Sequence, residues 1–243
     1  MSDPIALLNA LQVADSTLPI GRFVHSHGLE AWLAAHPDAP AEQLAELVEA
    51  VVCESVAPLD ATFTAHAHRA STPARLLALD DRLTARKLAP AARAASQAPG
   101  RQLAALAPQL VAAARAGTLT HDPRRPAEDA LVTYLAHRVR IRETDGNLAI
   151  VAGTLARALG VSAQDAVLVE LRGAAGALLS AAVRLGALNP TGAQLALAQL
   201  GPAFARAAGD ACTRTLDHVS ATAPELELFA LAHVRADARL FTT

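Results

Sequence analysis

Two pairs of histidines are the side chains best suited to binding a transition metal, because imidazole is a common ligand for such ions. His66 and His68 lie two residues apart in a segment of helical character. Residues at i and i+2 point about 200° apart on a helix, so these two imidazoles cannot share one ion and we expect ordinary surface or half-buried histidines. His25 and His27 lie where a loop meets a helix. A transient metal contact there stays open, but no third ligand is evident nearby.

Adjacent carboxylates at Asp80 and Asp81 could hold magnesium beside a diphosphate. The chain continues as DDRLT, however, without the third carboxylate of a DDxxD pattern, so we expect a solvated helix face supported by i,i+4 charge pairs. The sequence also has no Glu-x-x-His pair and no HExxH, GxSxG or GxxxxGK[ST] motif. It therefore predicts no catalytic residue, no metal site and no cofactor, and we do not expect an enzyme.

The elements that position these side chains are predicted to be helices. Hydrophobic residues make up 52% of the 243 residues but aromatic residues only 3%, and alanine and leucine, both strong helix formers, dominate. No segment alternates apolar and polar residues as a strand would. The sequence predicts an all-α fold: a single compact domain over residues 1–243, with about ten to twelve helices. The expected helices are Pro4–Ala14, His25–Ala35, Ala41–Ala57, Leu59–Ala70, Pro73–Lys87, Ala91–Gln97, Gln102–Ala116, Ala127–Arg138, Asp145–Leu159, Ala163–Leu185, Thr191–Ala208 and Glu225–Leu240.

Charge and composition exclude several classes of protein. Twenty-one basic and twenty-three acidic residues give a formal charge of -2, which disfavours nucleic-acid binding. The uncharged stretch from Leu185 to Ala205 is interrupted by prolines, asparagine and glutamines, so we expect no membrane span. The start MSDPIALLNAL lacks the features of a secretory signal, and Cys53 and Cys212 form no disulfide framework. These observations together predict a cytoplasmic protein.

The most specific pattern lies between Leu11 and Leu33, where LQVADSTLPIGRFVHSHGLEAWL joins two helical segments through a loop. Pro19 fixes φ, and Gly21 and Gly28 permit backbone conformations or close approaches that a Cβ would forbid. This stretch closely resembles the N-terminal signature of the urease accessory protein F (UreF) family, D-S-x-L-P-x-G-x-F-x-x-S-x-G-L-E. The residues that fit are Asp15, Ser16, Leu18, Pro19, Gly21, Phe23, Ser26, Gly28, Leu29 and Glu30.

Three later segments are similar to the same family in the same order, so the resemblance is nearly full length. The mid-chain element contains Arg93, Ser96 and Gly100. The helical centre and the C-terminus contain Gly153, Gly160, Ser180, Arg184, Gln194, Glu227, His233, Arg239, Leu240 and Phe241. Two positions depart from the family pattern: Arg22 replaces a small residue, and Asn189 stands where glycine is frequent. Both departures bear on how the chain docks onto partners.

The resemblance implies a nickel-insertion chaperone that works without covalent chemistry in the urease maturation complex. Family members dimerise, bind UreD (also called UreH), recruit the GTPase UreG and act through the complex on the urease apoprotein. The implied partner interface comprises Ser16, Pro19, Gly21, His25, Ser26, Gly28, Glu30, Ser180, Arg184, Gln194, Arg239, Leu240 and Phe241.

Several alternatives stay open. Glu30 could serve only to cap a helix, and Arg184 could form a structural ion pair. The C-terminal tail, about residues 225–243, is expected to dock onto UreD, but it could instead fold back on its own core. A different class of function, a divergent helical small-molecule enzyme or binding protein, also remains open.

Overall fold

The computed structural model describes residues 3–22, 28–116 and 125–221. Over these ranges the chain is all-α, with no strand, which confirms the predicted fold class. The elements are α1 (Pro4–Ala14), α2 (Leu29–Ala35), α3 (Ala41–Val51), the π-helical segment η2 (Val52–Ala61), α4 (Thr62–Arg69), α5 (Pro73–Arg86), α6 (Pro90–Ala116), α7 (Arg125–Arg140), α8 (Leu148–Ala158), α9 (Ala163–Arg184), α10 (Pro190–Gln199) and α11 (Gly201–Thr213). The predicted helix Glu225–Leu240 lies outside the described residues.

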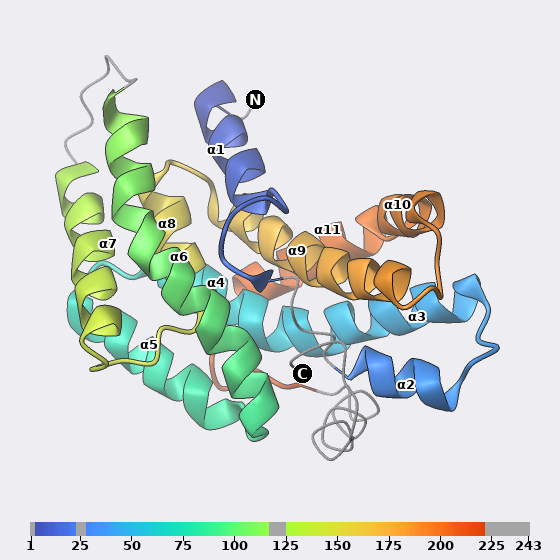
Figure 1. Cartoon of the computed structure of the whole chain (residues 1–243). Coiled ribbons are helices and arrows are strands. Elements are labelled where there is room, and N and C mark those ends of the chain that lie inside the picture. Colours follow the sequence, from blue (N-terminus) through green and yellow to red (C-terminus); the bar gives the residue numbers. More distant parts are fainter. Residues whose placement is uncertain (1–2, 23–27, 117–124, 222–243) are drawn as a thin grey trace.

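Helix α4 lies at the centre of the molecule, between two hydrophobic clusters (Figure 1). Its Phe63 and Ala67 belong to the cluster built with α5, α6, α7 and α8. Its Ala65 belongs to the cluster built with α3, η2, α9, α10 and α11. Residues 63 and 67 share one helix face and residue 65 lies on the opposite one, so α4 is buried on both sides.

The crossing of α4 and α8 depends on a glycine. A Cβ at Gly153 would lie 2.3 Å from the carbonyl oxygen of Thr64, closer than any side chain can approach. With glycine there, the two helix backbones come into direct contact, as expected for a core built mainly from small residues.

The segments α3, η2 and α4 form one continuous rod (Figure 1). The sequence predicts two helices, Ala41–Ala57 and Leu59–Ala70, separated at Pro58, and this boundary is wrong. Pro58 has no backbone N–H to donate, and the chain accommodates it by widening into a π-helical segment instead of ending. At the end of this segment the Thr62 hydroxyl donates to the carbonyl of Ala57 at 3.1 Å.

Two other predicted boundaries also differ from the structure. Helix α6 runs unbroken through Pro99 and Gly100, where a break was expected. Conversely, the predicted helix Thr191–Ala208 is divided at Leu200 into α10 and α11, because Pro202 in the first turn of α11 cannot donate to the preceding turn.

Helix α9 is long and apolar enough to cross a membrane by length and composition alone. In this fold 61% of its most apolar stretch is buried inside the protein, where it contacts α1, α2, α4, α8, α10 and α11. Its apolar character is therefore accounted for by its place in the core.

Candidate partner-binding surface

The loop that follows α1 is held in place by its own side chains. The carboxylate of Asp15 accepts hydrogen bonds from the backbone N–H of Thr17 at 2.7 Å and from the Thr17 hydroxyl at 2.8 Å. These two bonds favour the ionised form and lower the pKa of Asp15. Ile20, only 6% exposed, then inserts into the hydrophobic core. The turn is thus fixed at both ends while its tip faces solvent.

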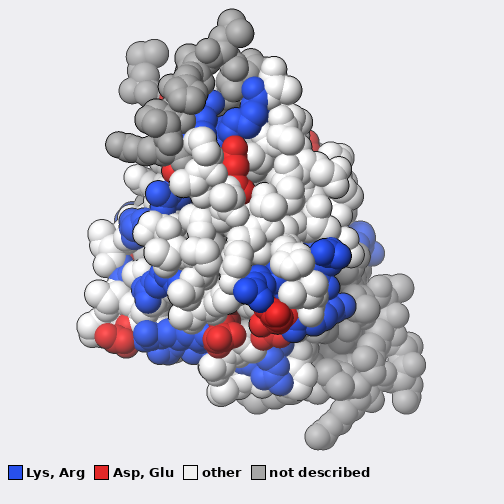
Figure 2. All heavy atoms as spheres, turned by 90° about the vertical axis from the view of Figure 1, so that its left-hand side faces the viewer, with Lys and Arg blue, Asp and Glu red and all other residues white. Residues whose placement is uncertain are grey.

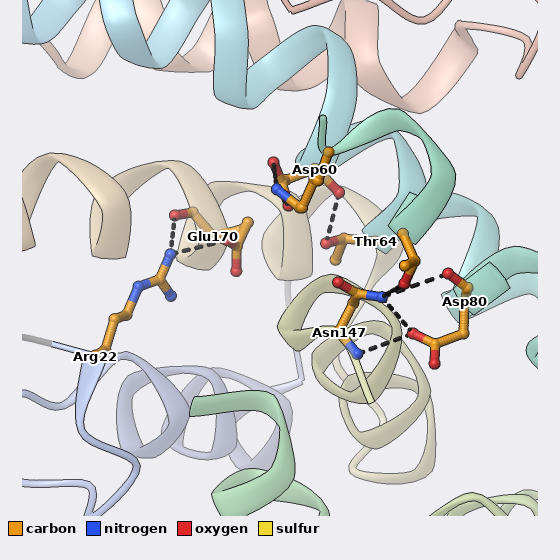
Figure 3. Close-up of polar contacts among 8 residues, drawn as sticks. Arg22, Asp60, Thr64, Asp80, Asn147 and Glu170 are labelled. Atoms are coloured by element: carbon orange, nitrogen blue, oxygen red, sulfur yellow. Dashed lines mark hydrogen bonds and ion pairs between the residues drawn. The ribbon is translucent and has the colours of Figure 1, made fainter. Parts of the chain in front are cut away.

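Gly21 and Arg22 direct the chain from this turn onto α9. Gly21 has φ of +72°, in the left-handed region that favours glycine. The Arg22 guanidinium donates to the Glu170 carboxylate at 2.9 Å and to the Glu170 carbonyl at 2.8 Å (Figure 3). Both side chains are largely buried, at 15% and 7% exposure, so the pair is well shielded from water.

A third residue makes room for this ion pair. A Cβ at Gly173 would lie 2.4 Å from Nη1 of Arg22. Arg22, which departs from the family pattern, therefore points inward over a glycine and adds little charge to the outside of the loop. Asn189, the other departure, also has a local role: it is the N-cap of α10, and its side chain accepts from the backbone N–H of Gly192 at 2.7 Å.

The structure brings together only some of the predicted interface residues of the N-terminal signature. Ser16, Pro19 and Gly21 are exposed on the same turn. Gly28, with φ of +87°, is buried directly before α2, and Glu30 is half-buried in the first turn of that helix. No side-chain cap precedes α2, so a carboxylate in its first turn complements the helix dipole. His25 and Ser26 lie outside the described residues.

The predicted interface residues of the helical centre lie elsewhere. Ser180 is half-buried near the C-terminal end of α9, ten residues beyond Glu170, which corresponds to about 15 Å along a helix. Arg184 and Gln194 are exposed on α9 and α10, and Nε of Arg184 donates to the carbonyl of Ser180 at 3.4 Å. These residues form a second region, separate from the turn. Arg239, Leu240 and Phe241 lie outside the described residues.

One exposed surface was missed by the sequence reasoning. On α1, Ile5, Leu7, Leu8 and Leu11 are 49%, 54%, 60% and 58% exposed, while Ala10 on the opposite side is buried. The helix carries no charged residue, and it projects from the body next to the turn (Figure 1). The available signal was the absence of any polar face on PIALLNALQVA, since a surface helix normally has one. Exposed apolar patches of this kind mark interaction sites.

The other candidate residues have structural roles. Nε2 of His66 lies 3.0 Å from the carbonyl oxygen of Arg214, and Nε2 of His68 lies 2.8 Å from that of Val161. The two imidazoles therefore bond to different segments, as the helix geometry predicts. Across the described ranges, no three His, Cys, Asp or Glu side chains come together in a group that could hold a metal ion. His25 and His27 lie outside those ranges.

The expectation of a solvated face at Asp80 is wrong. Asp81 is exposed, but Asp80 is fully buried, and its carboxylate accepts four hydrogen bonds from the turn before α8. Figure 3 shows Asp80 together with its partner Asn147. The donors are the Thr144 hydroxyl at 2.5 Å, the backbone N–H groups of Gly146 and Asn147 at 2.8 Å, and the Asn147 side-chain amide at 2.8 Å. These bonds also explain why α8 begins at Leu148 and not at the predicted Asp145.

Charged side chains on the α7 side of the molecule are of both signs (Figure 2). Arg138 at the end of α7 forms an ion pair with Glu143 and also stacks on the ring of Tyr134 at 4.9 Å. Elsewhere Arg115 pairs with Asp129 at 2.8 Å. A nucleic-acid backbone requires a continuous positive surface, and this face offers cations interspersed with carboxylates.

Two residues of the mid-chain element resembling the family, Arg93 and Gly100, also have defined contacts. Nη1 of Arg93 donates to the carbonyls of Lys87 and Leu88 at 2.7 and 3.0 Å, which fastens the turn between α5 and α6. A Cβ at Gly100 would lie 2.0 Å from the carbonyl oxygen of Gly146, so α6 can approach the turn before α8 only with glycine at this position.

Fold and surface together define the class: an all-α protein that presents an uncharged, exposed apolar helix next to a rigidly held turn. A family model described as UreF matches residues 39–201, about two thirds of the chain. The chain belongs to the UreF family. Among curated relatives, it is similar to urease accessory protein UreF of Cereibacter sphaeroides, with 30% identity over 98% of this chain and 99% of the relative. It is also 27% identical to urease accessory protein UreF of Corynebacterium efficiens, over 96% and 95% of the two chains.

A further relative, urease accessory protein UreF 1 of Brucella melitensis, is 27% identical over 97% of this chain and 92% of the relative. Each of these alignments covers at least 96% of the chain, whereas the family model matches only residues 39–201. The aligned part therefore also includes residues before position 39, where the N-terminal signature lies. The resemblance inferred from the sequence motifs is therefore confirmed at the level of the family.

Proposed function

We propose that this chain is a urease accessory protein that bridges UreD (UreH) and the GTPase UreG during assembly of the urease nickel centre. Family membership supports the accessory role. In this proposal the protein is a cytoplasmic nickel-insertion chaperone that acts as a homodimer by binding UreD and UreG. Nickel is the cargo of the complex that it organises. The urease apoprotein is reached through that complex.

The observation that carries the proposal is the exposed apolar face of α1. A large aliphatic side chain contributes about 1.5–3 kcal/mol when it goes from full exposure to full burial. Leu7, Leu8 and Leu11 are each more than half exposed, so a partner that covers them gains a substantial part of that free energy. The turn with Ser16 and Pro19 follows directly and supplies polar groups at the rim of the same surface.

The test is partner binding by the double variant Leu8→Ser, Leu11→Ser. We expect the Kd for the UreD homologue of the same host to rise at least tenfold, equivalent to about 1.4 kcal/mol, because these side chains lie at the centre of the proposed contact. Ile141→Ser, which also replaces an exposed aliphatic residue (41%) but lies after α7, is the matched control and should bind normally.

Both variants should keep the helical circular dichroism and the melting temperature of the parent, because the replaced side chains are exposed. In cells that carry the urease genes without their own UreF, the parent and Ile141→Ser should restore urease nickel content and the double variant should not. Normal UreD binding and normal urease activation by the double variant would contradict the proposal.

The tail is the second part of the proposed interface. Arg239, Leu240 and Phe241 combine a cation with two apolar side chains, and docking into UreD would bury both apolar groups. The region of Ser180, Arg184 and Gln194 is proposed as a separate contact, available to UreG or to the second protomer. Light scattering and pull-downs with Arg184→Ala and Gln194→Ala would assign it.

A further inference from the structure

A cavity of about 320 Å³ lies between η2, the turn from α5 to α6, α9 and residues 219–221. Much of its wall is apolar. Val56 and Leu59 line it from η2, Leu178 lines it from α9, and Ala92 and Ala95 line it from α6. The volume is large enough for several side chains, and the lining favours an occupant with apolar groups.

Polar groups lie at defined places in the same wall. The Arg22–Glu170 ion pair lines one part, and the Lys87–Asp60 pair, at 2.8 Å, lines another. Ser96 is only 7% exposed, and its hydroxyl has no hydrogen-bond partner within the part of the chain that the structure describes. Buried hydroxyls in folded proteins are normally bonded, so the occupant is expected to bring a polar group to Ser96.

The position of the chain itself indicates the occupant. Val219, Ser220 and Ala221 line the cavity, so the described chain ends at its rim, with residues 222–243 still to follow. That segment contains Leu226 and Phe229, spaced as neighbours on one helix face. Residues 23–27 also follow a lining residue, Arg22, but this span of five residues must connect to Gly28, whereas residues 222–243 supply a longer run of side chains.

Charge favours the same occupant. Lining cations are Arg22, Arg86 and Lys87, against the two carboxylates of Asp60 and Glu170. The guanidinium of Arg86 donates to a backbone carbonyl, that of Leu216, at 3.4 Å. The segment after Ala221 begins with two carboxylates, Glu225 and Glu227, whose charge complements this excess of cations.

We propose that in the free protein the C-terminal segment, residues 222–243, folds back and fills this cavity with its large apolar side chains. This fold-back contact does not rest on the function proposed above. If the same segment also docks into UreD, as that function implies, then binding of UreD must first release it from the cavity.

Limited trypsin digestion of the full-length protein tests the proposal, because Arg235 and Arg239 are cleavage sites inside the segment. Ala92→Trp fills the cavity from α6 and should accelerate cleavage at Arg235 at least tenfold relative to the parent, as followed by intact-mass spectrometry. Ala94→Trp adds the same side chain two residues further along α6, at an exposed position outside the cavity lining, and should be cleaved at the rate of the parent.

A second variant guards against misfolding of Ala92→Trp. Leu88 lines the cavity but is 84% exposed, so Leu88→Ser removes an apolar contact without disturbing the core, and cleavage should accelerate severalfold. Equal cleavage rates in the parent and in both cavity variants would overturn the proposal. Fast cleavage of all three proteins would mean that the segment is unbound, and slow cleavage of all three would mean that it docks elsewhere. If the segment is protected from trypsin at high protein concentration but not after dilution, the cavity is filled by the segment of a second copy, and the proposal is wrong. If the segment is protected only when UreD is added, it binds the partner and not the cavity, and the proposal is again wrong.

Discussion

Asp80 shows how much a single buried residue can determine. Its carboxylate is fully buried and holds the turn before α8 through the four hydrogen bonds from Thr144, Gly146 and Asn147. Asp81 is next to it in the sequence but faces solvent. Two identical side chains at adjacent positions should therefore differ greatly in their contribution to stability.

Asp80→Ala should lower the free energy of unfolding by about 3–5 kcal/mol, because it leaves several buried donors without an acceptor. Asp81→Ala is the matched control and should stay within about 0.5 kcal/mol of the parent. Urea denaturation followed by circular dichroism measures both. Similar midpoints for the two variants would show that the Asp80 network contributes little net stability.

The sequence could not distinguish these two residues, since helical periodicity alone does not reveal which turn will lie against a given carboxylate. The same holds for Arg22. Its charge at a loop position suggested an effect on docking, whereas the inward path to Glu170 depends on the missing Cβ of Gly173, about 150 residues away. In contrast, Gly21 and Gly28 were predicted to need backbone freedom, and both have positive φ.

At the scale of elements, α6 shows tertiary contacts overriding local signals. Pro99 and Gly100 predict a break, yet the helix continues for 27 residues from Pro90 to Ala116. Gly100 lets the helix pack directly against the turn held by Asp80, and α6 also packs along α7 and α8. The packing gained along the whole helix offsets the local cost of an internal proline.

Gly100→Ala should therefore destabilise the protein, by about 1–3 kcal/mol or more, because the new Cβ meets the backbone of Gly146 and Leu148. Gly209→Ala, in the interior of α11 with no atom within 4 Å of the new Cβ, should instead stabilise it by about 0.5–1 kcal/mol. Melting temperatures of the two variants should thus move in opposite directions. A neutral Gly100→Ala variant would mean that α6 can shift away from the turn.

Most helices could be predicted because their apolar residues recur with helical spacing and their ends carry recognisable caps. Pro4–Ala14 is found as predicted, and Ser162 caps α9 by accepting from the backbone N–H of Asp165 at 3.1 Å. Apart from the start of α8, which the Asp80 hydrogen bonds set, the errors described above lie at prolines. Pro58 and Pro99 are absorbed within helices, whereas Pro202 accompanies a real division. Which outcome occurs depends on the neighbouring helices, and these cannot be placed from one sequence.

At the scale of the whole molecule, His68 links the central helix to another part of the fold. It lies on α4 and bonds to the carbonyl of Val161, between α8 and α9. Burial is the main cause that lowers the pKa of His68 below its ordinary value of 6.5, and the nearby cations Arg157 and Arg69 lower it further. The hydrogen bond to Val161 and the carboxylate of Glu128 act in the opposite direction but do not cancel the shift.

The stability of the protein should consequently fall as the pH drops below about 6.5, because the unfolded chain takes up a proton at His68 before the folded chain does. Melting temperatures measured between pH 8 and pH 5 should show this decline, and His68→Gln should make it shallower. His218→Gln, at an exposed position, is the control and should keep the slope of the parent. Asp15 and Asp217, whose pKa values are lowered from 3.8, affect the stability of the protein only at more acidic pH. An unchanged slope for His68→Gln would assign the acid sensitivity to other groups.

The contact between Arg22, Glu170 and Gly173 has a consequence for exchanging parts between homologous chains. A chimera that received this N-terminal turn but kept a larger residue at position 173 would force the Arg22 guanidinium to shift from its place beside Glu170. One that kept Glu170 but received a small residue at position 22 would leave a buried carboxylate without its cation. These three positions, distant in the sequence, form one transferable unit, and any graft of the turn must carry all of them.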